Sequence, residues 1–294
     1  MITFKEIKYF IAVSEELNFR RAAKKLNITQ PPLSQQIKLL EEKIGFKLLK
    51  RDKSHVSLTL AGNKFLKDSY DITSKIKRSI LTGKKISRGE IGTLRIGFST
   101  LASFYILPAV ISKFYKIYKG VELQLKEMRT EKIIKEILDK KIDLGFAGKK
   151  IINKDINSIS LYKEKIILAI NKNNPLSKKK NISISDIKNE NFILFPKSKG
   201  TLGLYDKIIE FCKKGNFEPN VIQEAYEIEV ILGLVSGGMG IALIPENSGN
   251  LYLNNIIFKK FKENSPSSEI YLLIRKNEED SIVKNFFNLN KIKV

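Results

Sequence analysis

Apolar residues in the first 45 positions recur at helical spacing in three short runs, with polar residues between them. The pair Thr3 and Glu6, three residues apart, is a capping box that predicts the start of the first helix. A second helix is predicted over residues 19–26 and a third over about 30–43, where the apolar side chains fall on one edge. Three short amphipathic helices in succession predict a small all-α domain.

Residues 46–58 change to an alternating pattern around the polar sequence RDKSH, which predicts a small β-hairpin wing. Thr59 can cap a long helix that reaches about Ile86 in a strongly basic surround. The apolar positions of this helix form a single seam: Phe65, Ile72, Ile76 and Ile80. Because so small a domain cannot cover so long a seam, we expect the helix to pair with the same helix of a second subunit.

From about residue 92 onward the pattern changes to alternating strands and helices. The predicted strands are 94–99, 121–128, 143–147, 166–171, 192–196, 221–226, 241–245 and 270–275, and the predicted helices are 102–118, 131–140, 201–214 and 227–236, with a helical C-terminal end. Such alternation is typical of α/β architecture. We expect two similar lobes, lobe I over about 92–165 and 266–294 and lobe II over about 166–265.

The charge of the chain is strongly positive and unevenly distributed. Residues 1–90 hold 20 Lys/Arg against 9 Asp/Glu, a net charge of +11, and the other 204 residues hold 33 against 22, again +11. The density of positive charge is therefore more than twice as high in the N-terminal part, which favours a polyanionic partner for that part. For the C-terminal excess, a general preference for lysine in the source proteome is the simpler explanation.

Several classes of protein are disfavoured by the composition. Residues 1–14 show no apolar core behind a basic start, and the longest uncharged run, 230–245, is shorter than the ~20 apolar residues of a membrane span. One cysteine, Cys212, allows no internal disulfide. We therefore expect a cytoplasmic protein with no membrane partner and no exported solute-binding role.

Enzymatic activity is also disfavoured. The chain has a single histidine, His55, in the predicted wing, so the α/β half cannot hold a Ser-His-Asp or Cys-His catalytic arrangement. Cysteine and histidine are too few for a zinc site, and no G-x-S-x-G sequence is present. An enzyme that uses carboxylates or lysine alone stays open, but we expect no catalytic residue, no metal and no cofactor.

The order of these features resembles the LysR-type transcriptional regulators. The sequences TQPPLSQQIKLLE, KLLKR and LTLAG occur in that order before the long helix, and TLRIGFS, KIDLGFA and LGLVSGGMGIALIP follow in the α/β half. The resemblance covers essentially the whole chain and is most specific in the first 62 residues. In local pattern the C-terminal half is similar to members that sense carboxylates from aromatic catabolism.

The resemblance implies a fold, a domain organisation and partners. The fold is α/β with an N-terminal all-α winged helix-turn-helix at 1–58, a linker and dimerisation helix at 59–88, and a two-lobed α/β domain, similar to type 2 periplasmic binding proteins, at 92–294. The implied function is sequence-specific DNA binding modulated by a small effector, here a carboxylate, held between the lobes. The implied partners are double-stranded DNA, the effector, a second copy in a dimer or tetramer, and RNA polymerase.

The N-terminal end of the third helix carries the side chains suited to reading bases. In helix-turn-helix proteins this end enters the major groove, where Gln can pair with adenine and Pro can lie against a thymine methyl group. Proline at a helix start costs no backbone hydrogen bond. The expected base-contacting set is Thr29, Gln30, Pro31, Pro32, Ser34, Gln35 and Lys38, and the expected phosphate or minor-groove set is Arg20, Arg21, Arg51, Lys53 and His55.

Many LysR-type regulators carry Arg where this chain has Gln35, so the base preference of those regulators is not assigned to this chain.

Two other interpretations of the N-terminal domain remain. Residues 1–58 could form a protein-interaction module with a solvated basic face, or a sequence-tolerant architectural DNA-binding domain. Hydrogen-bonding side chains at Gln30, Ser34 and Gln35 favour base reading, because a purely electrostatic surface would use Lys or Arg.

The predicted effector site lies where strands of the α/β half end and helices begin. Helix N-termini there offer free N–H groups and partial positive charge to an anion. The expected residues are Ser99, Thr100, Thr130, Ser198, Thr201 and Ile228, and the resemblance implies effector contact for the hydroxyls of Ser99 and Thr130. Each Ser or Thr could instead be a simple helix cap. Some relatives add an Arg after the third strand, where this chain has Ala147, Gly148 and Lys149.

Overall fold

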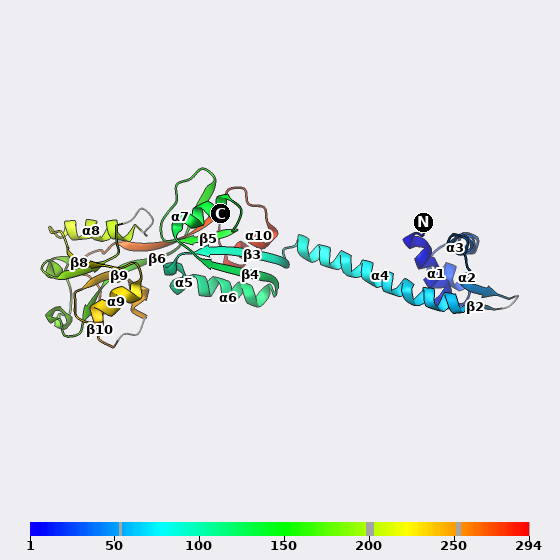
Figure 1. Cartoon of the computed structure of the whole chain (residues 1–294), viewed down its shortest axis with the longest axis horizontal. Helices are drawn as coiled ribbons and strands as arrows, with labels where there is room; N and C mark the ends of the chain where they lie inside the picture. The colour runs from blue at the N-terminus through cyan, green and yellow to red at the C-terminus, as the bar shows by residue number, and fades with distance from the viewer. Residues whose placement is uncertain (53–54, 198–202, 251–253, 294) are drawn as a thin grey trace. The chain divides into compact units, whose positions relative to one another are not determined.

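The computed structural model describes residues 1–52, 55–197, 203–250 and 254–293, and the chain divides into two compact units, residues 1–84 and 85–294 (Figure 1). Of the predicted site residues, Lys53, Ser198 and Thr201 lie outside the described residues.

The N-terminal unit begins with three helices, α1 (Phe4–Glu16), α2 (Phe19–Lys25) and α3 (Gln30–Ile44). Thr3 and Glu6 exchange both hydrogen bonds of the predicted capping box. Side chains from all three helices are fully buried in one core: Phe10, Val13, Ala22, Leu33, Ile37 and Leu40. This core fixes the inner edge of α3, so the opposite edge of that helix faces solvent.

The wing and the long helix follow. β1 (Leu49–Arg51) and β2 (Val56–Leu58) pair antiparallel, and α4 (Leu60–Ser87) begins directly after them. The Thr59 hydroxyl accepts a hydrogen bond from the Gly62 N–H at 2.8 Å, which is the cap that the sequence predicts.

The apolar seam of α4 is covered at one end only. Phe65 is half-buried and its ring centroid lies 5.3 Å from that of Phe10, so this residue packs against the core of its own chain. Ile76 is half-buried, whereas Ile72 and Ile80 are 43% and 55% exposed. The exposed seam is therefore shorter than the sequence suggests.

The first lobe of the C-terminal unit is built on one sheet with helices packed on both faces. β3 (Ile91–Phe98) pairs in parallel with β4 (Gly120–Glu127) and with β5 (Leu144–Ala147), and β11 (Ser267–Arg275) pairs antiparallel with β5. The helices of this lobe are α5 (Thr100–Tyr105), α6 (Leu107–Ile117), α7 (Thr130–Leu138) and α10 (Ser281–Asn290). Phe114 of α6 and Phe286 of α10 belong to one core cluster, while Ile133 of α7 belongs to another, so the helices cover both faces of the sheet (Figure 1).

One long strand connects the two lobes. β6 (Ile156–Asn171) pairs with β11 up to Lys165, and from Ile166 it pairs with β9 (Ala242–Pro245) and β10 (Ile256–Lys259) of the second lobe. The rest of the second lobe comprises β7 (Asn191–Leu194), β8 (Asn220–Glu224), α8 (Leu204–Lys214), α9 (Ile228–Ser236) and 3-10 turns at Pro175–Lys178, Ile184–Ile187 and Glu246–Asn250. The chain thus crosses between lobes near residues 165 and 266.

Three elements differ from the sequence prediction, and one of them, the strand β10, was not predicted at all. The helix expected over 102–118 is two helices, because Pro108 has no N–H to continue the ladder and instead occupies the first turn of α6. The strand expected over 166–171 begins ten residues earlier, since its pairing with β11 is a long-range contact that local pattern does not encode.

Candidate functional site

The exposed face of α3 presents the predicted base-contacting residues. Thr29, at the N-cap, has extended backbone angles and makes no side-chain cap bond, so its hydroxyl is not used to start the helix. Thr29, Gln30, Pro31, Pro32, Gln35 and Lys38 are exposed, and Ser34 is half-buried. Buried Leu33 and Ile37 anchor the other edge. Amide and hydroxyl groups therefore stand at one helix end on a fixed scaffold, a pattern suited to hydrogen bonds with base edges.

The predicted cations around α3 differ in how firmly they are held. Arg51, on the wing, donates to the Ser34 hydroxyl at 3.4 Å, lies 3.8 Å from Glu41 and stacks over Phe19 at 4.8 Å. Arg21 donates to the Glu16 carbonyl at 2.6 Å. These two side chains have defined orientations before any ligand arrives.

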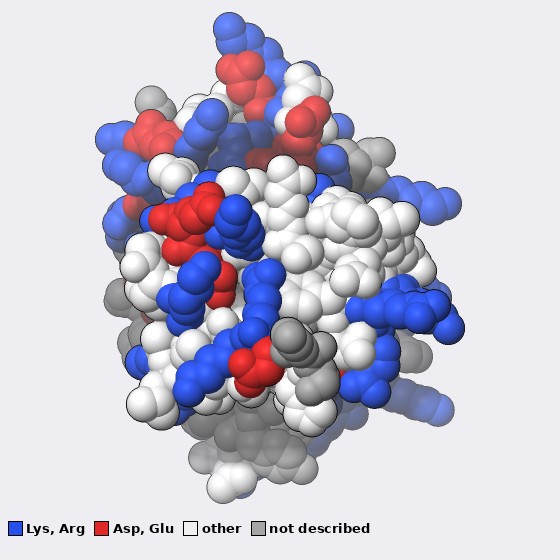
Figure 2. Space-filling model, turned by 90° about the vertical axis from the view of Figure 1, so that its right-hand side faces the viewer, with Lys and Arg blue, Asp and Glu red and all other residues white. Residues whose placement is uncertain are grey.

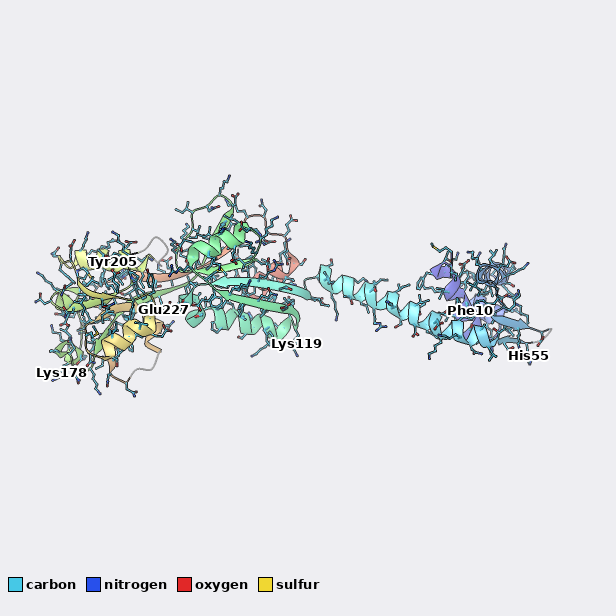
Figure 3. All side chains as sticks on the ribbon, in the orientation of Figure 1. Phe10, His55, Lys119, Lys178, Tyr205 and Glu227 are labelled. Carbon is cyan, nitrogen blue, oxygen red and sulfur yellow. The ribbon has the colours of Figure 1, made fainter. Side chains whose placement is uncertain are left out.

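Other cations extend into solvent. Arg20 is exposed on α2, and His55 is exposed on the wing, where Figure 3 labels it near the hairpin tip. Lys50, which the sequence prediction omitted, is also exposed on β1 opposite Ser57. In Figure 2 the face of the N-terminal unit turned to the viewer shows Lys and Arg side chains around and between uncharged ones.

A buried carboxylate joins α3 to the wing. Glu41 of α3 is 3% exposed, and its Oε1 accepts hydrogen bonds from the N–H groups of Leu48 at 2.9 Å and Leu49 at 3.1 Å. Its Oε2 lies 3.2 Å from Lys47 Nζ. The sequence prediction missed Glu41, although a charged residue on the inner edge of an amphipathic helix is the pattern that could have revealed it.

In the C-terminal unit, Ser99 and Thr130 lie at the ends of neighbouring strands. Phe98 and Glu127 are register partners in the parallel β3–β4 pair, and Met128 N–H donates to the Phe98 carbonyl at 2.9 Å. Ser99 follows β3, and within the described part of the chain its buried Oγ has no hydrogen-bond partner. Thr130, the first residue of α7, is 3% exposed. The predicted hydroxyl side chains of Ser99 and Thr130 therefore cluster at the carboxyl edge of the sheet.

Two other predicted effector residues are less available. The Thr100 hydroxyl is 2.5 Å from Glu127 Oε1 and donates to this carboxylate, so it is already engaged. Ile228 starts α9 and is 5% exposed, which makes it part of the core of the second lobe.

Arg129 is a functional candidate that the sequence prediction missed. It is the N-cap residue of α7, and its guanidinium carbon lies 5.4 Å from the ring centroid of Tyr226. Tyr226 follows β8 in the second lobe and is 57% exposed. Figure 3 labels the next residue, Glu227, on the side of the second lobe nearest the first lobe. This contact connects the two lobes beside Ser99 and Thr130.

A buried carboxyl group lies where β6 passes between the lobes. Glu164 is 8% exposed, and the pKa of its carboxyl is raised to about 7. Burial is the main cause, the hydrogen bond from Asn247 N–H at 2.8 Å opposes the rise, and the charge of Glu246 adds to it. Burial also raises the pKa of Cys212 to about 12, so this thiol stays protonated.

Across the described residues, no group of three or more His, Cys, Asp or Glu is arranged to hold a metal ion. Within the same residues no helix could span a membrane.

Comparisons with known proteins match both units. The family model for the bacterial regulatory helix-turn-helix protein, lysR family, matches residues 4–63, and the model for the LysR substrate binding domain matches residues 87–290. The regulator AlsR of Bacillus subtilis is 35% identical over 286 residues, 97% of this chain and 94% of AlsR. BenM of Acinetobacter baylyi is 30% identical over 285 residues, 96% of this chain and 93% of BenM.

Solved structures agree in fold. CbnR, a LysR family transcriptional regulator, superposes with a TM-score of 0.86 at 24% identity, covering 98% of this chain and all of CbnR. Full-length BenM superposes with a TM-score of 0.62 at 28% identity, covering 99% of this chain and 96% of BenM. The family matches, together with the helix-turn-helix and the two-lobed unit, show that the chain belongs to the LysR family of bacterial transcriptional regulators.

Proposed function

We propose that the N-terminal domain reads DNA sequence through the first turns of α3 and that a small anionic effector modulates this binding from between the two lobes. The observation that carries the DNA proposal is the exposed end of α3, where Gln30 and Gln35 stand on a helix anchored by buried Leu33 and Ile37. CbnR, which has a similar fold, has been solved in complex with its target DNA. Arg20, Arg21, Arg51, Lys53 and His55 are proposed to contact phosphates or the minor groove.

Two variants distinguish base reading from a purely electrostatic contribution. We expect Gln30→Ala to weaken binding to the cognate site by about 1–3 kcal/mol and to relax preference at one base pair. Lys50→Ala, on the exposed wing strand, is the matched control: it should weaken binding to all duplexes alike and lower the salt slope by about one. Affinities measured on a cognate and a scrambled duplex distinguish the two. An equal loss on both duplexes for Gln30→Ala would exclude it from base reading.

The anionic effector is supported by the group at the carboxyl edge of the first lobe. Ser99 Oγ, Thr130 and the N-terminus of α7 provide donors and partial positive charge, and Arg129 adds a full charge. An effector acts by binding one arrangement of the lobes more tightly than the other. Calorimetry and thermal-shift measurements across small carboxylates test this proposal, and no response to any of them would remove the anion assignment.

Further proposals concern the assembly. The domain division is proposed as 1–58, 59–88 and 92–294, with lobe I at 92–165 and 266–294. We propose a dimer through the exposed seam of α4, centred on Ile72, Ile76 and Ile80. Tetramer formation and contact with RNA polymerase are proposed as further steps. We also propose that the protein is cytoplasmic and has no catalytic activity. Sedimentation equilibrium of the full chain tests self-association, and a monomer at micromolar concentration would contradict the dimer.

A further inference from the structure

Arg129 has three properties that distinguish it from the other cations of the first lobe. It is exposed, it lies at the start of a helix of nine residues, and within the described part of the chain no carboxylate lies within ion-pair distance of it. The two nearest acidic residues along the chain have other partners, since Glu127 accepts from Thr100 and Glu131 lies 3.8 Å from Lys149 Nζ. The charge of Arg129 is therefore not neutralised by these carboxylates.

A second, independent observation lies beside it. Ser99 Oγ is buried without a hydrogen-bond partner, one strand away from Arg129, because the β3–β4 register brings the ends of the two strands together. A buried hydroxyl without a partner costs free energy that a bound acceptor would recover. A carboxylate at this edge could accept from Ser99, from the first N–H groups of α7 and from Arg129.

The contact with Tyr226 gives Arg129 a defined orientation. A guanidinium is planar, so one face can stack on an aromatic ring while the N–H groups at its edge stay available for a two-point hydrogen bond to a carboxylate. At 5.4 Å from the centroid, the Arg129 guanidinium is within cation–π distance of the Tyr226 ring. Because Arg129 belongs to the first lobe and Tyr226 to the second, an acid bound at the edge of Arg129 would be coupled to the position of the second lobe.

We propose that Arg129 is the specificity-determining residue that recognises the acid group of the effector, and that Tyr226 orients its guanidinium across the lobes. This inference rests on the anionic effector proposed above. The proposed effector is a carboxylate that forms two hydrogen bonds with the Arg129 guanidinium. Tyr226 is the residue through which the second lobe responds to effector binding.

Ligand binding tests the first part. Full-length protein is titrated by calorimetry with small aromatic and aliphatic carboxylates, benzoate and succinate among them, and with the neutral amide of each. We expect the wild type to bind at least one acid and not its amide. Arg129→Gln should weaken that binding at least tenfold. Arg129→Lys should recover only part of the loss, because an ammonium cannot bind in two-point geometry while stacked.

Matched variants separate this role from general charge and from folding. Lys132→Gln removes one positive charge from the same helix, at a side chain that is 63% exposed and lies 3.8 Å from Glu136. It should leave acid binding unchanged. Tyr226→Ala should weaken binding severalfold, and Tyr226→Phe, which keeps the ring, should retain more binding than Tyr226→Ala. An unchanged melting temperature of each variant shows that it folds.

A spectroscopic measurement tests the contact between lobes without any ligand. The chain contains no tryptophan, so Tyr226→Trp introduces a single reporter. Its emission and its quenching by acrylamide should change when Arg129→Gln is added and stay the same when Lys132→Gln is added. An identical signal with and without Arg129 would overturn the proposed contact.

The outcomes distinguish the two proposals. If wild type binds an acid and Arg129→Gln binds it equally, the role of Arg129 is wrong while the anionic effector stands. If the wild type binds none of the acids, the anionic effector fails and the recognition role of Arg129 fails with it, while the tryptophan signal still decides whether Arg129 contacts Tyr226.

Discussion

Removal of the Glu41 carboxylate should destabilise the N-terminal unit and displace its wing. The side chain is 3% exposed and accepts hydrogen bonds from two backbone N–H groups, those of Leu48 and Leu49, which are 0% and 3% exposed. Glu41→Ala leaves both donors buried without a partner. Since the pairing connects α3 to the wing, its loss should also move the wing cations relative to α3.

The magnitude follows from these contacts. A buried donor left unpaired costs about 1–3 kcal/mol, so two of them give about 2–6 kcal/mol. The lost pairs with Lys47 and Arg51 add little, because those side chains are 68% and 36% exposed. Domains are stable by about 5–15 kcal/mol, so Glu41→Ala should remove a large share of the stability of the unit. Glu41→Gln keeps an acceptor oxygen and should lose about half as much.

Glu42→Ala is the matched control. Glu42 is the neighbouring residue on the same helix, its side chain is 54% exposed, and it forms only a 3.8 Å pair with Lys38 four residues away. Its removal should cost less than about 0.5 kcal/mol. Calorimetric unfolding of the full chain and amide hydrogen exchange at Leu48 and Leu49 measure the effects. Exchange and unfolding of Glu41→Ala that match those of Glu42→Ala would refute the reasoning.

Two further predictions concern the C-terminal unit. Burial raises the pKa of Glu164 in the folded protein to about 7, from an ordinary value of 4.5. The folded state therefore holds the proton more tightly than the unfolded state, and stability falls as the pH rises from about 4.5 to 7. Urea midpoints should show a loss of about 1–3 kcal/mol over this range, and Glu164→Gln should abolish it. A pH dependence that persists in Glu164→Gln would assign it to other groups. Gly89→Ala should lower stability by about 1–3 kcal/mol, because Gly89 has φ +66° and an added Cβ would lie 2.6 Å from backbone atoms of Ser281 and Ile282. The comparison variant is Gly83→Ala in α4, at a position of the N-terminal unit where nothing is within 4 Å of an added Cβ. It should raise stability by up to about 1 kcal/mol, and thermal unfolding that ranks the two variants otherwise would contradict both assignments.

Local pattern was sufficient where short-range chemistry determines the structure. The capping box at Thr3, the start of α3 at Gln30 and the cap at Thr59 depend on neighbours within four residues, and each is present. The fold predicted from these signals and from the LysR resemblance, a winged helix-turn-helix with a two-lobed α/β unit, is confirmed. The exposure of the Gln30 end follows from the apolar edge that fixes α3.

Contacts between residues far apart in the sequence could not be predicted from local sequence pattern. The full length of β6 depends on β11, about a hundred residues away, and the stacking of Arg129 on Tyr226 joins positions of similar separation. Glu41 was overlooked because its partners are backbone N–H groups, which have no sequence signature. The engagement of Thr100 with Glu127 is likewise a strand-register contact, invisible until the parallel pair is known.

The central claim is that this regulator reads sequence through the end of α3. The most direct test is binding of the full-length protein to the DNA upstream of its own gene, compared with a scrambled duplex of equal length and composition, across a salt titration. The proposal predicts a preference for the upstream DNA that persists as salt rises, because base contacts do not release counterions. Equal affinities that fall together with salt would show that charge alone holds the DNA.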